Sequence, residues 1–197
     1  TGVINDHKYF AGNLTLIKSL NLDFDLPFFE KITNEGKTPI LLAGEKQILA
    51  IFAVADTIKP EAKSVISLLH KLNIKTAMLT GDHQNTAQYI ASQLGIDNVI
   101  AQVLPNHKAD EIKKLKQQNF QVAMVGDGIN DAPALVTSDV GIAMGTGTDI
   151  AIESASITLL GGQIKKLPQS IKLSRETMKT IKQNLFWAFF YNVISIP

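Results

Sequence analysis

The chain has 197 residues, of which 45% are hydrophobic, and it carries a formal net charge of +1 and no cysteine. This composition is ordinary for a globular protein, so it excludes wholesale disorder and allows a sizeable core. The balanced charge gives no indication of a nucleic-acid surface. The lack of cysteine excludes disulfides and cysteine metal clusters within these residues.

Residues 1 to about 55 predict short strands and helices without a regular repeat. Strand-like apolar sequence is found at 8–11, 39–42 and 48–54, with turns at Gly12-Asn13 and Gly44-Glu45. A short helix is predicted over residues 28–34, ended by Gly36.

From Ile74 onward the pattern becomes regular. Apolar strands are predicted at 75–79, 99–103, 121–125, 140–143 and 157–160, with helices between them at 84–94, 108–118, 130–136 and 148–153. Strands that alternate with helices predict a parallel sheet covered on both faces. Ligands of such sheets bind beyond the carboxyl ends of the strands, so the residues that follow each strand are candidates for a site.

The first of these strands ends in Leu79-Thr80-Gly81-Asp82, just before a predicted helix. A hydroxyl there can donate to a phosphate oxygen, and the helix N-terminus adds backbone donors and a favourable dipole. The alternative is a plain helix cap, in which Thr80 or Asp82 satisfies free amides of the helix.

The second strand leads through Pro105, Asn106 and His107 to Lys108, on the first turn of a helix. A cation is disfavoured at that position unless an anion is near, which makes Lys108 a candidate phosphate partner. We expect the later lysines of this helix on a solvated face: Lys113, Lys114 and Lys116.

The third strand ends in the loop Gly126-Asp127-Gly128-Ile129-Asn130-Asp131, and Ala132-Pro133 then opens a helix. Two carboxylates at the carboxyl end of a parallel strand are well placed to hold Mg²⁺ beside a phosphate. The alternative is an ordinary strand-to-helix turn, because Asp-Gly and Asn-Asp are common turn and cap pairs. Together the strand ends supply a hydroxyl, a lysine and carboxylates, the parts of a phosphoryl-transfer site apart from its nucleophile.

The C-terminal segment is different in character. Cations at 165, 166, 172, 175, 179 and 182 precede the apolar, aromatic run of residues 185–197. Thirteen such residues are fewer than the roughly twenty that span a bilayer. The segment is therefore interpreted as the start of a truncated membrane helix, or alternatively as a terminal helix that packs on the domain.

These motifs carry a resemblance to a known family. TGD at 80–82, the segment Pro105–Lys108 and GDGIND at 126–131 resemble the phosphorylation domain of P-type ATPases, in the haloacid-dehalogenase-like superfamily. Asp56-Thr57-Ile58-Lys59-Pro60 and the run Asp139–Glu153 are similar to that family too. The resemblance implies an α/β fold, with a Rossmann-like parallel sheet flanked by helices and preceded by part of a small α+β nucleotide-binding domain.

The resemblance also implies roles for single residues. Asp127 and Asp131 would form the Mg²⁺ site, with Asn130 positioning the phosphoryl group. Thr80 would hydrogen-bond the phosphoryl oxygens and Lys108 would balance their charge. Gly81 and Asp82 would shape the same wall, with Asp82 nearer the nucleotide.

Family members are phosphorylated by ATP on an aspartate in a D-K-T-G-T motif, which does not occur in these 197 residues. The chain is accordingly interpreted as a fragment that cannot form the aspartyl-phosphate alone. Gly12-Asn13 resembles the Gly-Asn beside ATP in the nucleotide domain of the heavy-metal branch, although Gly-Asn is also a common turn. The expected parts are 1–54 of the nucleotide-binding domain, 55–164 of the phosphorylation domain, and the stalk with a membrane helix at 165–197.

Residues 184–192, NLFWAFFYN, closely resemble the membrane helix that follows the phosphorylation domain in copper-transporting ATPases. The resemblance implies that Tyr191 and Asn192 contribute to a Cu(I) pathway. The alternative makes Tyr191 an interfacial aromatic residue and Asn192 a helix-packing polar group. Copper or silver is favoured over other heavy metals.

The expected function is ATP-driven export of Cu(I) by a multi-pass membrane protein, with this chain on the cytosolic side. ATP, Mg²⁺ and Cu(I) brought by a copper chaperone are the implied ligands, and no nucleic acid is expected. The alternatives are a soluble Mg²⁺-dependent phosphatase of the same superfamily and a non-catalytic nucleotide-binding module. His83 departs from the asparagine that often follows TGD in the family, and we interpret it as a surface or capping residue.

Overall fold

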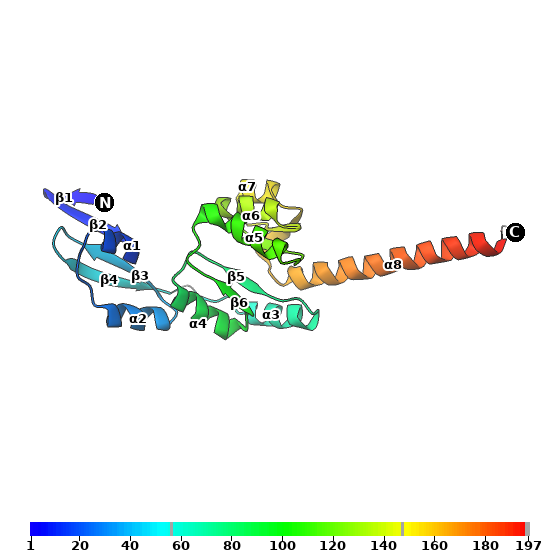
Figure 1. Cartoon of the computed structure of the whole chain (residues 1–197), viewed down its shortest axis with the longest axis horizontal. Coiled ribbons are helices and arrows are strands. Elements are labelled where there is room, and N and C mark those ends of the chain that lie inside the picture. Colours follow the sequence, from blue (N-terminus) through cyan, green and yellow to red (C-terminus); the bar gives the residue numbers. More distant parts are fainter. Residues whose placement is uncertain (56, 147, 196–197) are drawn as a thin grey trace.

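The structure is a computed structural model that describes residues 1–55, 57–146 and 148–195. Asp56 and Gly147, which belong to two of the motifs above, lie outside the described residues, as do the last two residues of the apolar tail. An antiparallel sheet with two helices lies at one end, an α/β body occupies the middle, and a long helix projects from the other end (Figure 1).

The N-terminal lobe consists of β1 to β4 with α1 and α2. Its antiparallel sheet has the order β1(Gly2–Ile4), β2(His7–Gly12), β3(Thr38–Ala43) and β4(Ile48–Val54). The predicted strands are found here, whereas β1 and the helix α1(Leu14–Ser19) were not predicted. Alternate residues of β3 point inward, and the core of the lobe is formed by Ile17, Phe29, Leu41 and Ala43.

The helix α2(Leu26–Asn34) begins where local sequence dictates. The Asp25 side chain accepts a hydrogen bond from the Phe28 amide, and Pro27 occupies the first turn, where no amide is required. The chain leaves the helix through Gly36, whose φ of 75° suits glycine.

The α/β body begins with α3(Ala62–Lys71), β5(Ala77–Leu79), α4(Gln84–Leu94) and β6(Asn98–Ile100). It continues with the short helix η1(Pro105–His107), α5(Lys108–Gln117), β7(Ala123–Gly126), η2(Ile129–Asp131) and α6(Ala132–Thr137). β8(Val140–Met144), α7(Asp149–Glu153), β9(Ile157–Leu159) and η3(Leu160–Gly162) complete it. The predicted alternation of strands and helices is confirmed, with the strand bounds shifted by a few residues.

The predicted parallel arrangement is found, and its strands are divided between two sheets. β5 pairs in parallel with β6 alone, and β7, β8 and β9 form a second parallel sheet. Within the described residues, no strand joins β5 to β7, so each of these strands is an edge of its own sheet. The alternation of strands and helices predicts that the strands run parallel. It does not predict which strands pair, because pairing depends on which segments of the chain lie side by side.

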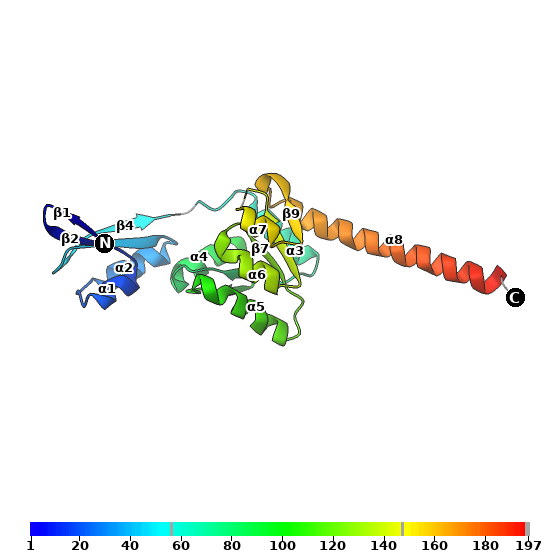
Figure 2. The ribbon, with the colours of Figure 1, turned by 90° about the horizontal axis from the view of Figure 1, so that it is seen from above.

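Apolar clusters cover both faces of the second sheet. Ile142, Met144 and Leu159 pack with Val65 and Leu69 of α3, while Met124 packs on the other side with residues of α5, α6 and α7: Ile112, Leu135 and Ala151. Figures 1 and 2 show α5, α6 and α7 gathered together, with α3 on the far side of the body. This packing holds the loop that follows β7 on a rigid support.

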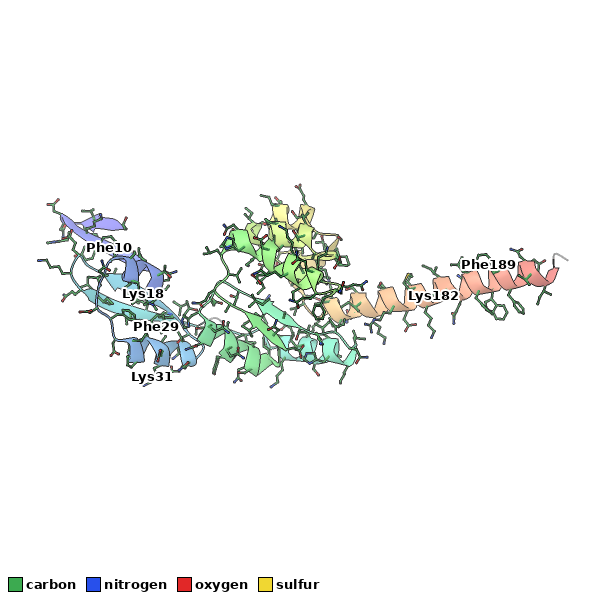
Figure 3. All side chains as sticks on the ribbon, viewed as in Figure 1. Phe10, Lys18, Phe29, Lys31, Lys182 and Phe189 are labelled. Atoms are coloured by element: carbon green, nitrogen blue, oxygen red, sulfur yellow. The ribbon has the colours of Figure 1, made fainter. Side chains whose placement is uncertain are left out.

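The helix α8(Lys166–Ser195) is continuous over 30 residues. Leu167 at its start is buried against α3, whereas every residue from 172 to 194 is exposed. Lys182 and Phe189 stand on the projecting part (Figure 3). Among the described residues no helix combines the length and apolar character required to cross a membrane.

Candidate functional site at the carboxyl ends of the strands

The loop after β7 is organised around Asp131, which is 9% exposed. Its Oδ2 accepts hydrogen bonds from the amides of Asp127 and Gly128, each at 3.4 Å. Gly126 makes this arrangement possible, because a Cβ on it would lie 2.7 Å from the Asp131 Cβ. The Asp131 carboxylate is thereby held in place, while Asp127 and Asn130 are exposed at the rim of the loop.

Lys108 reaches this loop from the start of α5. Its Nζ lies 2.7 Å from Asp131 Oδ1, and the two side chains are only 17% and 13% exposed. Lys108 stands on the first turn of a helix, where an unpaired cation is unfavourable. The Asp131 side chain of the neighbouring loop supplies the anion that it needs. A charge-assisted bond of this kind is stronger than a hydrogen bond between neutral groups.

The turn after β5, residues 80–82, is closed on itself. Thr80 Oγ1 donates to Asp82 Oδ2 at 2.8 Å and accepts from the Asp82 amide at 3.1 Å. Backbone bonds then hold the turn to the segment after β6, from the Val103 amide to the Thr80 carbonyl and from the Gln102 amide to the Asp82 carbonyl. The alternative that Thr80 or Asp82 caps α4 is wrong, because the cap is His83, whose Nδ1 accepts from the Asn85 amide.

The side-chain oxygens at the carboxyl ends of the strands are suitable ligands for Mg²⁺. No group of three or more His, Cys, Asp or Glu side chains placed to hold a metal occurs in the part of the chain that the structure describes. Mg²⁺ does not require one, since it keeps several waters and commonly binds one or two carboxylates together with substrate phosphates. Asp127 and Asp131 offer such a pair, and Asn130 adds an amide oxygen.

The remaining predicted residues lie elsewhere. The Asn13 side chain accepts a hydrogen bond from the Leu16 amide and so caps α1, while Gly12 packs against the Leu16 side chain. Tyr191 and Asn192 are exposed in the last turns of α8, whose C-terminal end projects away from the α/β body (Figure 2). Neither pair is brought to the loop of Asp127.

One prediction for the α5 lysines needs correction. Lys113 and Lys114 lie on an exposed face, as expected, at 59% and 63% exposure. Lys116 is less exposed, at 37%, and its Nζ contacts Asp139 Oδ1 at 2.9 Å and the Thr137 carbonyl at 3.1 Å. Asp139 also accepts from the Val122 amide, and these bonds lower the pKa of Asp139 below its ordinary value.

Comparison with known proteins identifies the family of the chain. The family model of haloacid dehalogenase-like hydrolases matches residues 4–139. The chain belongs to the haloacid dehalogenase-like hydrolases. It is also homologous to proteins named copper-exporting P-type ATPase from Staphylococcus aureus strains MW2 and JH9, with 50% identity over 98% of this chain.

Two solved ATPase structures are also similar to this haloacid dehalogenase-like chain. A zinc-transporting PIB-type ATPase in the E2.Pi state matches 97% of it with a TM-score of 0.73 and 34% identity, over 31% of that protein. The catalytic domain of the CPx-ATPase CopB-B matches 68% of it with a TM-score of 0.57 and 32% identity, over 53% of that domain. The chain spans about a quarter of the length of the curated relatives that it matches.

Proposed function

We propose that this chain forms part of a P-type ATPase that transports Cu(I), or Ag(I), across a membrane and passes through an aspartyl-phosphate. The Lys108–Asp131 pair at the carboxyl ends of the strands carries the proposal. It sets a cation and a fixed carboxylate side by side, and phosphoryl transfer depends on such positioned charges. The identity of 50% to copper-exporting relatives supports it.

The separation of the two parallel sheets supports the same proposal. Among the residues that the structure describes, β5 and β7 are each paired on one side only, so both can accept another strand at the opposite edge. A strand inserted between them would complete a single sheet and bring its own carboxyl end between the Thr80 turn and the Asp127 loop. We propose that a D-K-T-G-T segment of the parent protein occupies this place and presents the nucleophilic aspartate there.

In this arrangement each of the predicted site residues at the strand ends has a defined role. Lys108 and the Thr80 hydroxyl would bind oxygens of the transferring phosphoryl group. Asp127 and Asp131 would hold Mg²⁺, which when bound neutralises charge on the phosphates, and Asn130 would orient its waters. Gly81 and Asp82 would form the wall toward the nucleotide, with Gly12 and Asn13 of the N-terminal lobe on its other side.

The domain assignment follows as part of this proposal. Residues 1–54 would belong to the nucleotide-binding domain, 55–164 to the phosphorylation domain, and 165–197 to a stalk that leads into the bilayer. The cations of α8 precede an aromatic cluster in which Phe186 stacks on Phe190 at 5.8 Å, and Trp187 contacts both rings. Cations followed by aromatics are typical of a membrane interface, and this orientation would leave the α/β body in the cytosol.

Copper is proposed over zinc on the sequence of the tail. Tyr191 and Asn192 lie in the segment that resembles the copper-transporting branch, and the relatives of 50% identity are named for copper. The zinc-transporting structure is less similar, at 34% identity. Delivery of Cu(I) by a copper chaperone is part of the proposal.

The test is acyl-phosphate formation from radiolabelled ATP by the full-length protein that contains this chain, with Cu(I) or Zn(II) supplied. We expect a hydroxylamine-sensitive label that depends on Cu(I) and is lost in Asp127→Ala. Asp110→Asn, at an exposed position of the helix that carries Lys108, is the matched control and keeps the label. Labelling with Zn(II) alone would overturn the copper assignment, and no covalent label with either metal would overturn the transport mechanism.

A further inference from the structure

The N-terminal lobe touches the α/β body along one face of α4. His83, Thr86 and Tyr89 are spaced at three-residue intervals, so they lie on neighbouring parts of that face. They meet α2 and the turn that follows it, and Figures 1 and 2 both show α2 beside α4. The same helix begins directly after the Thr80 turn.

The contact at the start of α4 is aromatic. The His83 ring lies 5.5 Å from the Phe29 ring, centroid to centroid, with an interplanar angle of 83°, an edge-to-face arrangement. Phe29 is 3% exposed and belongs to the core of the N-terminal lobe, so its ring is fixed by its own neighbours (Figure 3). His83 is therefore packed against a rigid part of the lobe.

Two further contacts complete this interface. The Thr86 hydroxyl, on a residue that is 2% exposed, donates to the Lys37 carbonyl at 3.0 Å. The Tyr89 ring lies against Gly36, where a Cβ would come within 2.2 Å of the Tyr89 Cδ1. These contacts restrict the position of the lobe along α4, whereas His83 acts at the end that adjoins the Thr80 turn.

His83 has two functions that can be separated. Its Nδ1 accepts from the Asn85 amide at 3.3 Å, which caps α4, and its ring packs on Phe29. Asparagine is among the preferred capping residues and can supply the cap without the ring. The histidine at this position therefore adds a contact between the lobes that a purely capping residue lacks.

We propose that His83 is a positioning residue that holds the N-terminal lobe in register with the Thr80 turn through its ring contact with Phe29. The effect on lobe orientation follows from the contacts alone. The consequence for phosphoryl transfer rests on the proposed function, because a nucleotide held by the N-terminal lobe must present its phosphate to the Thr80 turn. Small misplacements of reacting groups reduce the rates of such steps.

The first experiment measures lobe orientation in the full chain. The sequence has no cysteine, so spin labels on Lys18→Cys in α1 and Lys113→Cys in α5 report a single distance distribution without background. We expect this distribution to broaden in His83→Ala and equally in His83→Asn, although the asparagine keeps the cap. Phe28→Leu, on the same helix as Phe29 but 48% exposed, is the matched control and leaves the distribution unchanged.

A double-mutant cycle then identifies the partner of His83. Phe29→Leu should broaden the distribution, and adding His83→Asn to it should have little further effect, because both substitutions remove the same contact. His83→Phe restores a ring without the cap, and we expect it to narrow the distribution again relative to His83→Ala. A distribution in His83→Asn as narrow as that of the unsubstituted chain would overturn the positioning role.

The second experiment measures phosphoenzyme formation by the full-length protein as a function of ATP concentration. We expect His83→Asn to raise the ATP concentration for half-maximal labelling on the order of tenfold. The final level of labelling at saturation should change little, because Thr80 and Lys108 are intact. A broadened distance together with no label in the unsubstituted protein would support the positioning role and overturn the proposed function, whereas an unchanged distance overturns the positioning role whatever the label shows.

Discussion

The two parallel sheets of the α/β body are fastened in the same way at their amino ends. In the β5–β6 sheet, Asp97 precedes β6 and accepts hydrogen bonds from the amide and hydroxyl of Thr76, which precedes β5. In the other sheet, Asp139 precedes β8 and accepts from the amide of Val122, which precedes β7. In each case the helix before the first strand adds a side chain to the aspartate: His70 of α3 at 3.0 Å and Lys116 of α5 at 2.9 Å.

At their carboxyl ends the two sheets differ. The Thr80 turn is closed by bonds between Thr80 and Asp82, two residues apart, while the Asp127 loop is tied to a distant helix through Lys108 and Asp131, 23 residues apart. The amino ends are therefore alike in their hydrogen bonds, whereas the carboxyl ends present different polar groups. The two sheets thus share a similar helix–strand framework, but a hydroxyl lies at the carboxyl end of one sheet and a charge pair lies at the carboxyl end of the other.

The largest effect is expected from breaking the charge pair. Lys108→Met leaves the Asp131 carboxylate partly buried without its cation, and under the proposed function it also removes the charge that balances the phosphoryl oxygens. We expect the rate of phosphoenzyme formation to fall on the order of a hundredfold. Lys114→Met, which removes an exposed pair on the same helix, should leave the rate unchanged, and an equal loss in both variants would contradict the specific role of Lys108.

The packing of the second sheet provides the next test. Gly141 of β8 lies under α6, and a Cβ there would stand 2.7 Å from the Leu135 carbonyl oxygen, a backbone atom that cannot rotate away. Gly141→Ala should lower the free energy of unfolding by about 1–3 kcal/mol, measured by urea denaturation. Gly2→Ala, where the added Cβ meets nothing within 4 Å, is the control. Equal stability of the two variants would show that α6 moves freely over this sheet.

Removing the Thr80 hydroxyl, which follows β5 of the other sheet, should slow phosphoenzyme formation less than breaking the Lys108–Asp131 pair. Thr80→Val keeps the shape of the side chain but leaves Asp82 without its bonding partner, and it removes one proposed donor to the phosphoryl group. We expect phosphoenzyme formation to slow about tenfold, the equivalent of one ordinary hydrogen bond. Thr80→Ser retains the hydroxyl and should remain near the unsubstituted rate. A loss in Thr80→Ser as large as in Thr80→Val would show that the methyl group is the critical part.

The aspartates at the amino ends predict how stability depends on pH. Hydrogen bonds from Thr76 lower the pKa of Asp97, and bonds from Val122 and Lys116 lower that of Asp139, each below its ordinary value of 3.8. A carboxylate that is more acidic in the folded state stabilises the fold above its unfolded pKa. That contribution is lost as the pH falls through the folded value.

We therefore expect Asp97→Asn and Asp139→Asn to reduce the free energy of unfolding at pH 7. The difference from the unsubstituted chain should shrink as the pH is lowered below about 4, where the aspartates take up protons on unfolding. Urea denaturation at pH 7 and at pH 3 measures this. Asp110→Asn is not a control here, because Lys113 lowers the pKa of Asp110 as well. A constant difference at both pH values would contradict the assignment.

Local sequence was sufficient to predict much of the fold. The helix α4 was predicted with its observed bounds, because an apolar stripe lies between a capping residue and Gly95 at φ 78°. The strands of the body were recognised from their apolar runs, and the residues after them identified Thr80, Lys108 and Asp127 as candidates. Each of these features depends on neighbours within a few positions.

Tertiary structure decided what the sequence left open. Nothing near Lys116 indicates that Asp139, 23 positions away, is its partner, so a solvated lysine was the natural expectation. The contact between Phe29 and His83 likewise joins residues that are distant in the chain, and a histidine next to a helix start predicts only a cap. The order of the strands could not be predicted from local sequence either, because a sheet is formed by whichever segments lie side by side.

The sequence by itself thus determined the type of fold, which polar residues follow the parallel strands and the family to which the chain belongs. Short-range patterns carry that information, since caps, turns and apolar periodicity act within one element. Only the tertiary structure decided that the parallel strands form two sheets, that Lys108 is paired with Asp131, and that α4 bears the N-terminal lobe. These features depend on contacts between distant elements, which no local pattern specifies.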